Sequence, residues 1–372
     1  MVKRALPATL AVATTAALLA TTASQATASP ASSTASGSRT EVIATGLDNP
    51  RGLIVGPGGA VLVTEAGRGG PGPCAVGAVG QVFCYGTTGA VTAVIRGHQR
   101  RIVTGLPSFG TRDSAEVFGP HDIALTRSGA LVTIGLGTNP AQRDVLGPVA
   151  RKLGTILKLR SQRIFADLAA FEAANDPDQG QPASFPDSNP YGMIPHKNGG
   201  VVVTDAGGND LLRVDKHGRI SVLAVFPVEP TPGPDGAIIP MHFVPTTVVR
   251  GPDGAYYVGQ LTGFPFPVGG ARVWRVVPGQ APTIYAGGFT NIIDIAFDQR
   301  GRLLVLEITA NGLLSGNPAG ALIRVDKSGA RTELAAGELT TPTSVAVGKD
   351  GTLYVSNKGT LVGVGEVLRI RP

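Results

Sequence analysis

The chain has 372 residues, with 52 glycines, 29 prolines and 16% charged residues. This composition favours many short strands joined by tight turns over a helical protein. The formal net charge of the whole chain is +6, and it falls to +4 if residues 1–28, with two basic and no acidic residues, are removed. So small and scattered a positive charge excludes a nucleic-acid-binding class.

Residues 1–28 have the pattern of a secretory signal peptide. Lys3 and Arg4 precede an apolar Ala/Leu/Thr run that ends at Ala26-Thr27-Ala28, a small-x-small cleavage site. Threonines interrupt the run, which disfavours a retained membrane anchor. The sequence therefore predicts cleavage near Ala28, a flexible Ser/Ala/Thr-rich linker over 29–39, and a secreted, extracellular protein without a membrane span.

The two cysteines, Cys74 and Cys84, lie in one Gly/Pro-rich segment. In an exported chain this proximity favours a local disulfide. A two-cysteine metal site is disfavoured because no histidine lies nearby in the sequence to complete it.

A pattern of 17 residues recurs six times, as two apolar runs around a glycine-containing turn. The copies are NPRGLIVGPGGAVLVTE (49–65), GPHDIALTRSGALVTIG (119–135), NPYGMIPHKNGGVVVTD (189–205), VPTTVVRGPDGAYYVGQ (244–260), NIIDIAFDQRGRLLVLE (291–307) and TPTSVAVGKDGTLYVSN (341–357). Position 0 of the repeat is Gly52, Asp122, Gly192, Thr247, Asp294 or Ser344, and position 7 is always glycine. Asn-Gly and Asp-Gly pairs at the turn predict two-residue type I′ hairpins.

Third and fourth apolar strands follow several copies, for example at 211–215 and 220–226. Four antiparallel strands per unit and six units predict an all-β fold, a six-bladed β-propeller over residues 40–372. The last unit lacks a fourth strand, and residues 41–47 match the missing pattern. We therefore expect the N-terminal strand to pair with the C-terminal blade and close the ring, which removes free sheet edges. A segment at 164–182 predicts one short helix that ends at Asp176-Pro177.

Polar side chains end the second strand of five units. These position-13 residues are Glu65, Gly135, Asp205, Gln260, Glu307 and Asn357. In a two-residue hairpin, position 0 faces position 13, so both sets are expected to converge at one end of the central channel. Asp294 would then face Glu307, a carboxylate pair that needs a shared proton or a cation. His121, Asp122, Arg51 and Tyr191 are expected at the same rim.

Oxygen ligands favour Ca²⁺ over Zn²⁺ at such a ring, with Glu65, Asp205, Glu307 and Asn357 as candidate metal ligands. The alternative is structural, because side-chain oxygens at strand ends also accept hydrogen bonds from loop N–H groups. His98, His196 and His217 are expected to be exposed, and His242 to be a packed loop residue. Phe264 and Phe266, between prolines in the loop 261–270, predict either a plug for the channel mouth or an apolar recognition patch.

The blade pattern resembles NHL-type repeats, and residues 40–372 resemble the ScyD/ScyE family of exported six-bladed propellers. The stretches that carry this resemblance are LDNPRGL, the Cys74–Cys84 loop, GPHDIAL, LAAFEAANDPD followed by DSNPYG, and GQLTGFPFPVGGARVWRV. The family implies the fold and an exported context and no settled activity. The arrangement is also similar to calcium-dependent gluconolactonase and phosphotriesterase propellers. This resemblance implies that Glu65, Asp205 and Asn357 would bind the metal.

The preferred functional prediction is a secreted binding or interaction module whose small-molecule or extracellular partner is recognised at the channel rim and long loops. The alternative is a Ca²⁺-dependent hydrolase of lactones or esters, similar to SMP-30/gluconolactonase. In that case the candidate catalytic residues are Asp294 or the pair His121 and Asp122, acting as general base on a metal-bound water. No G-x-S-x-G motif occurs, so a serine nucleophile is not indicated. A monomer is expected.

Overall fold

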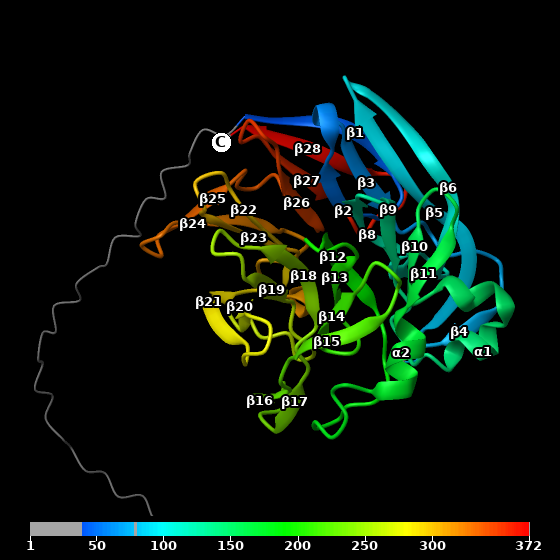
Figure 1. Ribbon diagram of the computed structural model, residues 1–372. Helices are drawn as coiled ribbons and strands as arrows, with labels where there is room; N and C mark the ends of the chain where they lie inside the picture. The colour runs from blue at the N-terminus through cyan, green and yellow to red at the C-terminus, as the bar shows by residue number, and fades with distance from the viewer. Residues whose placement is uncertain (1–38, 78–79, 372) are drawn as a thin grey trace, which may run out of the picture. The chain divides into compact units, whose positions relative to one another are not determined.

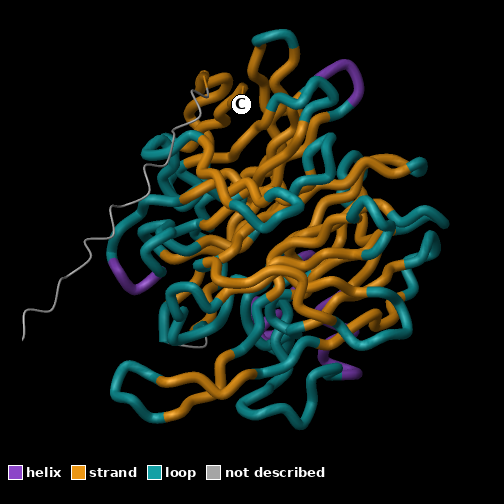
Figure 2. The backbone as a smooth tube through the Cα atoms, turned by 90° about the vertical axis from the view of Figure 1, so that its left-hand side faces the viewer, coloured by secondary structure: helices purple, strands orange, loops and turns teal. Residues whose placement is uncertain are grey.

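The computed structural model describes residues 39–77 and 80–371, and shows six sheets arranged as the blades of a β-propeller (Figure 1). The fold predicted from the repeat is confirmed. The proposed leader, and the proposed linker apart from Arg39, lie outside the described residues. Strands dominate the backbone throughout, with a few short helical segments (Figure 2).

Each blade begins at the channel with the first strand of a repeat. The strands are, for blade 1, β2 (Pro50–Val55), β3 (Val61–Glu65), β5 (Val82–Ile95) and β6 (His98–Thr111), with β4 (Cys74–Val76) and β7 (Val117–Phe118) added; for blade 2, β8 (Pro120–Thr126), β9 (Gly129–Ile134), β10 (Thr155–Lys158) and β11 (Arg163–Asp167); for blade 3, β12 (Pro190–Pro195), β13 (Val201–Asp205), β14 (Asp210–Val214) and β15 (Ile220–Val225). Blade 4 has β18 (Pro245–Arg250), β19 (Tyr256–Gln260), β20 (Ala271–Val276) and β21 (Thr283–Phe289); blade 5 has β22 (Ile292–Phe297), β23 (Leu303–Glu307), β24 (Ala321–Val325) and β25 (Arg331–Leu334); blade 6 has β26 (Ser344–Val347), β27 (Leu353–Asn357) and β28 (Gly365–Arg371).

The N-terminal strand closes the ring, as the sequence predicted. Strand β1 (Arg39–Leu47) pairs antiparallel with β28 and becomes the outer strand of blade 6. In Figure 1 the blue β1 therefore lies beside the red β28. Ala44 and Leu47 are buried under this strand, so closure adds apolar contact as well as backbone hydrogen bonds.

The inner hairpins differ from the predicted two-residue turns. In blades 1, 3, 4, 5 and 6, the turn contains three residues between the two residues that close it with a hydrogen bond. In blade 4, for example, the Gly251 N–H donates to the Ala255 carbonyl (2.9 Å), and within the turn the Gly254 N–H donates to the Gly251 carbonyl (2.9 Å). The repeat glycine has a positive φ, 83° at Gly254 and 77° at Gly59. This is a three-residue turn with the glycine in the left-handed region, and it explains why the position must be glycine. Among the six inner hairpins, only that of blade 2 has a two-residue turn, at Arg127-Ser128.

The apolar core lies between neighbouring blades. One cluster, for example, combines Ala124 and Leu131 of blade 2 with Met193 and Val203 of blade 3. Packing between sheets in this way fixes the blades around the channel and positions the residues that line it.

The insertions form small local elements. The predicted helix is α2 (Leu168–Asn175), whose N-cap Asp167 accepts the Ala170 N–H. The others are α1 (Gln142–Leu146), η2 (Pro148–Lys152), η3 (Leu313–Ser315) and the hairpin of β16 (Glu229–Pro232) and β17 (Ile238–Met241), whereas η1 (Pro57–Gly59) is the inner turn of blade 1. No helix among the described residues has the length and hydropathy needed to cross a bilayer.

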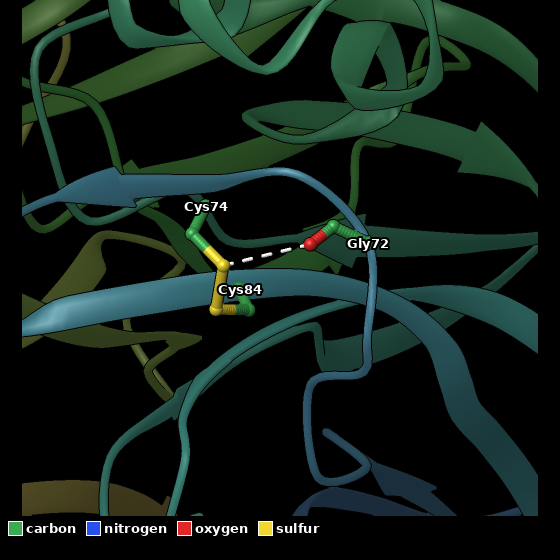
Figure 3. Close-up of a disulfide and its surroundings, with 3 residues drawn as sticks. All are labelled: Gly72, Cys74 and Cys84. Carbon is green, nitrogen blue, oxygen red and sulfur yellow. Dashed lines mark hydrogen bonds between the residues drawn. A yellow bond between two sulfur atoms is a disulfide. The ribbon is translucent and has the colours of Figure 1, made fainter.

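Cys74 and Cys84 form the predicted disulfide, which ties β4 to β5 (Figure 3). The Cys74 Sγ lies 3.5 Å from the carbonyl oxygen of Gly72 in the approach to β4. The bond joins cysteines that are ten positions apart in the sequence, and it is compatible with an oxidising compartment.

Candidate functional site

The channel narrows to a cavity of about 20 Å³ at the start of the inner strands. All six position-0 residues line it: Gly52, Asp122, Gly192, Thr247, Asp294 and Ser344. Their predicted convergence is therefore correct. A cavity of this size holds about one water molecule, so the middle of the channel has no room for an organic substrate.

Asp122 bridges two blades across the channel wall. Its Oδ1 accepts the Ile123 N–H (2.7 Å) in its own strand, and its Oδ2 accepts the Met193 N–H (2.7 Å) in blade 3. Burial, and then the negative charge of Asp294, raise the pKa of Asp122 to about 8. Gly52 makes room for it, since a Cβ there would lie 2.4 Å from Asp122 Oδ1.

Asp294 does the same for blades 4, 5 and 6. Its Oδ1 accepts from Thr247 Oγ1 (2.6 Å) and its Oδ2 from Ser344 Oγ (2.6 Å) and the Val345 N–H (2.8 Å). Burial raises its pKa, and these donors oppose that rise. Both channel carboxylates thus have their oxygens committed to neighbouring strands.

His121, Tyr191 and Arg51 lie beside this pair at the residue before each position 0. His121 is 2% exposed, and its ring lies 4.4 Å from that of Tyr191. Burial, and then the charge of Arg51, lower the His121 pKa to about 3. The imidazole is therefore neutral, and Nδ1 donates to the Pro190 carbonyl (3.0 Å).

The Arg51 guanidinium is buried and donates to main-chain carbonyls, those of Val117 (3.2 Å), Pro50 (3.3 Å) and Gly359. Burial lowers its pKa. The side chain links blade 1 to the loop after β27, so its contacts are those of a strut between segments.

The position-13 residues do not line the channel cavity, contrary to the prediction. Instead, four of them accept a backbone N–H from the loop that enters their own blade. These bonds are Asp48 N–H to Glu65 (2.8 Å), Asn189 N–H to Asp205 (2.5 Å), Thr290 N–H to Glu307 (2.7 Å) and Thr340 N–H to Asn357 (2.8 Å). A strand rich in valine therefore ends on a carboxylate because that side chain accepts a hydrogen bond from the loop that enters the blade and holds this loop in place.

The predicted pairing of position 0 with position 13 is wrong because it assumed an inner turn of two residues, which differs in length from the turn observed. In blade 5, Asp294 pairs with Leu306 and Glu307 pairs with Ile292, with a bulge between, so the expected Asp294–Glu307 pair is wrong. Side chains alternate between faces along a strand, so a register shift of one residue turns position 13 away from the channel. Gly135, the one apolar position 13, leaves space for His121, since a Cβ there would lie 2.2 Å from its Cε1.

The candidate metal ligands are held separately. Glu65 is buried and accepts from Thr92 Oγ1 (2.6 Å) and Arg101 Nη2 (2.6 Å), while Asn357 Nδ2 donates to Glu366 (2.9 Å). Burial raises the pKa of Glu307 to about 7. Among the described residues, Glu65, Asp205 and Glu307 do not form a group close enough to share an ion. Their role as ligands stays a prediction.

A different acidic group does have that spacing. Carboxylate oxygens of Glu172, Asp176 and Asp178, on α2 and the turn after it, lie within 4.8 Å of one another. The sequence offered a signal, since Asp-Pro-Asp follows a helix that carries a glutamate, but it was interpreted only as a helix end.

The remaining predicted residues lie on loops. His98 and His217 are exposed and His196 partly so, and His242 is partly buried with Nδ1 3.1 Å from Asn209 Nδ2. Phe264 is 49% exposed and neither it nor Phe266 lines the channel cavity. The plug is therefore not formed at that cavity, and the recognition patch stays a prediction.

A larger hollow than the channel cavity, which the sequence did not indicate, lies at the opposite end of the strands. The hairpin turns of blades 5 and 6 border a cleft of about 550 Å³ lined by Arg300, Arg302, Arg324 and Arg371, with Asp298 and Asp350. The four arginines come from three separate strands or turns, so no local run of charge revealed them.

No family model matches the chain, and no curated protein matches it. Solved structures match as six-bladed propellers. A streptogramin B lyase has a TM-score of 0.50 at 13% identity, covering 90% of this chain and 97% of that one. A protein of unknown function from Bacteroides thetaiotaomicron has a TM-score of 0.55 at 9% identity, covering 90% and 75%. The calcium-binding protein regucalcin from Agrobacterium tumefaciens has a TM-score of 0.49 at 13% identity, covering 88% and 93%. The first two similarities show the fold alone.

Proposed function

We propose that this protein is an exported binding module for a ligand that carries an anionic group such as sulfate, phosphate or carboxylate. The observation that carries the proposal is the cleft between blades 5 and 6, where four arginines line about 550 Å³. That volume lies in the range of small-molecule sites, and arginine is the side chain best suited to bind oxyanions.

The charge in the cleft is not balanced by its own acids. Asp298 accepts the Arg302 Nε (2.6 Å) and the N–H groups of Arg300 and Arg302 (both 2.9 Å). Asp350 caps its own turn through Thr352. In the described chain, the side chains of Arg300, Arg324 and Arg371 make no ion pair.

Crowding of these cations supports the same proposal. Burial, and then the nearby charges of Arg302 and Arg300, lower the pKa of Arg324, with Asp298 opposing. An anion between the arginines would remove that repulsion and make charge-assisted hydrogen bonds.

The hydrolase alternative has less support. Its candidate catalytic groups, Asp122 and Asp294, surround a cavity of about 20 Å³, and their oxygens accept hydrogen bonds from neighbouring strands. A hydrolase needs an accessible substrate pocket beside its base. Ca²⁺ at the position-13 residues and membership of the ScyD/ScyE family both remain proposals.

The test is isothermal titration of the mature protein with sulfate and with inorganic phosphate at low ionic strength. We expect saturable binding that weakens at least about tenfold in the double variant Arg300→Gln/Arg324→Gln, since each charged hydrogen bond lost contributes roughly 1.5–3 kcal/mol. Arg219→Gln is the matched control, because Arg219 is an exposed arginine on blade 3.

Equal affinity in the double variant, or no binding in the millimolar range, would refute the cleft as the site. A parallel screen of lactones and esters addresses the alternative, since turnover lost in Asp122→Asn would favour the hydrolase.

A further inference from the structure

Five carboxylates gather where helix α2 and the segment after it meet blade 3. Glu172 comes from α2, Asp176 and Asp178 from the turn that follows, Asp187 from the segment leading to blade 3, and Asp210 from the start of β14. The ligand atoms of the first three lie within 4.8 Å of one another.

Three of these side chains are buried, Asp176 and Asp187 are partly buried, and all five are incompletely hydrogen-bonded. Glu172 is 2% exposed, Asp178 3% and Asp210 0%. One buried oxygen each of Glu172, Asp176, Asp178 and Asp187, and both of Asp210, has no hydrogen-bond partner. Buried polar atoms are nearly always paired, so this concentration of unpaired oxygens indicates a missing partner.

The described part of the chain supplies no cation to them. None of the five forms an ion pair with Lys or Arg. Burial, and then the charges of Asp205, Asp176 and Asp178, raise the pKa of Glu172 to about 8. Burial and the charge of Asp205 raise that of Asp187 to about 7. Either protons or a bound cation must offset this repulsion.

The local backbone is shaped around the group. Asp176 ends α2 in the left-handed region (φ 40°), which turns the chain so that Asp178 returns toward Glu172. Gly208 gives access, since a Cβ there would lie 3.0 Å from Glu172 Oε2. Asn209 Nδ2 donates to Asp178 Oδ2 (2.9 Å) and lies 3.1 Å from His242 Nδ1, so that nitrogen is already engaged.

We propose that Glu172, Asp176 and Asp178 bind a calcium ion, with Asp187 and Asp210 beside it as further oxygen donors. An all-oxygen, carboxylate-rich set suits Ca²⁺, which takes six to eight oxygen ligands in flexible geometry. The ion fastens α2 and the segment 176–188 to blade 3. The site lies beside one position-13 residue, Asp205, which pairs with Asp210 between β13 and β14, and it does not depend on the anion-binding proposal.

The test is calcium titration of the metal-stripped mature protein, followed by calorimetry and by thermal unfolding. We expect Ca²⁺ to bind and to raise the melting temperature, and binding to weaken at least about 100-fold in Glu172→Gln/Asp178→Asn, because calcium affinity depends on ligand charge. In chelator the double variant should unfold no earlier than the wild type, since it removes repulsion, and this comparison shows that it is folded.

Two further variants make the result specific. Asp176→Asn changes a partly exposed ligand at a φ that asparagine tolerates, so it tests the site if the double variant does not fold. Glu333→Gln is the control, an exposed carboxylate on β25 of blade 5 that belongs to neither candidate metal site and should keep full calcium binding. Absence of Ca²⁺ binding by the wild type, or equal binding by wild type and ligand variants, would overturn the proposal; in the first case protons neutralise the group.

Discussion

The single glycine among the position-13 residues shows how closely His121 is packed. A Cβ on Gly135 would lie 2.2 Å from His121 Cε1 and 2.6 Å from Asn189 Oδ1, yet the residue does not have a positive φ. The backbone therefore allows alanine, and the contacts with His121 and with Asn189 Oδ1 exclude it. The other five blades have a side-chain oxygen at position 13, whereas in blade 2 the imidazole of His121 from the neighbouring strand takes its place.

We predict that Gly135→Ala lowers the free energy of unfolding by about 1–3 kcal/mol through overpacking. Urea denaturation of Gly135→Ala, His121→Ala and the double variant measures the coupling. The double variant should recover at least about 1 kcal/mol relative to the sum of the single losses, because the shortest contact of the new Cβ is with His121. Strictly additive losses would show that His121 is not what excludes the Cβ.

Asp122 allows a prediction about pH. Its pKa in the folded protein, about 8, lies above the ordinary value of 3.8. The folded state therefore holds a proton that the unfolded state releases, and the associated stability is full below about pH 4 and is lost as the pH rises through about 8.

Asparagine at position 122 cannot ionise, so Asp122→Asn should remove this part of the pH dependence. The free energy of unfolding, measured by urea denaturation from about pH 4 to pH 9, should fall less steeply in the variant than in the wild type. Parallel curves for the two proteins would mean that the folded state does not raise the pKa of Asp122.

At the scale of elements, the closing strand is the most consequential one. Strand β1 supplies the outer edge of blade 6, and its Leu47 is fully buried. Without it, β28 would become an exposed edge with unpaired backbone groups.

We predict that a chain beginning at Asp48 loses at least about 3 kcal/mol of unfolding free energy relative to one beginning at Arg39, from the buried Ala44 and Leu47 alone. Denaturant unfolding of both chains, with size-exclusion chromatography to detect pairing through the freed edge, measures the effect. A shortened chain that is equally stable and monomeric would contradict closure by β1.

For the whole molecule, the architecture followed from the repeat because six similar hairpins with a missing last strand admit few arrangements. Strand 41–47 matched the missing position, and the structure pairs it there. The side-chain directions did not follow, because the position-7 glycine adopts a positive φ in two turn types of different length. One residue of difference placed Glu65 and Asp205 away from the channel.

The two proposed sites could not be predicted from the repeat, for a different reason. Arg300 and Arg371 are far apart in sequence and meet only after the blades have closed, whereas Glu172, Asp176 and Asp178 are close in sequence but lie outside the six repeats. A pattern search within one repeat cannot bring such residues together. Composition gave no help, because the acids and arginines nearly cancel in the net charge.

The fold separates these sites, and that separation allows a final prediction. The carboxylates lie on α2, its following turn and β14, whereas the arginines border the hairpin turns of blades 5 and 6. The two sets share no residue, and coupling between distant sites requires an element with two states that both ligands bias. Because each blade is a hydrogen-bonded sheet of its own, we expect no element that both ligands bias. Sulfate affinity, measured by calorimetry with the protein in chelator and then in saturating Ca²⁺, should therefore agree within about twofold, since distant independent sites combine additively. A tenfold change would reveal a conformational link across the propeller, and sulfate binding that survives in Glu172→Gln/Asp178→Asn would show that the cleft functions without the ion.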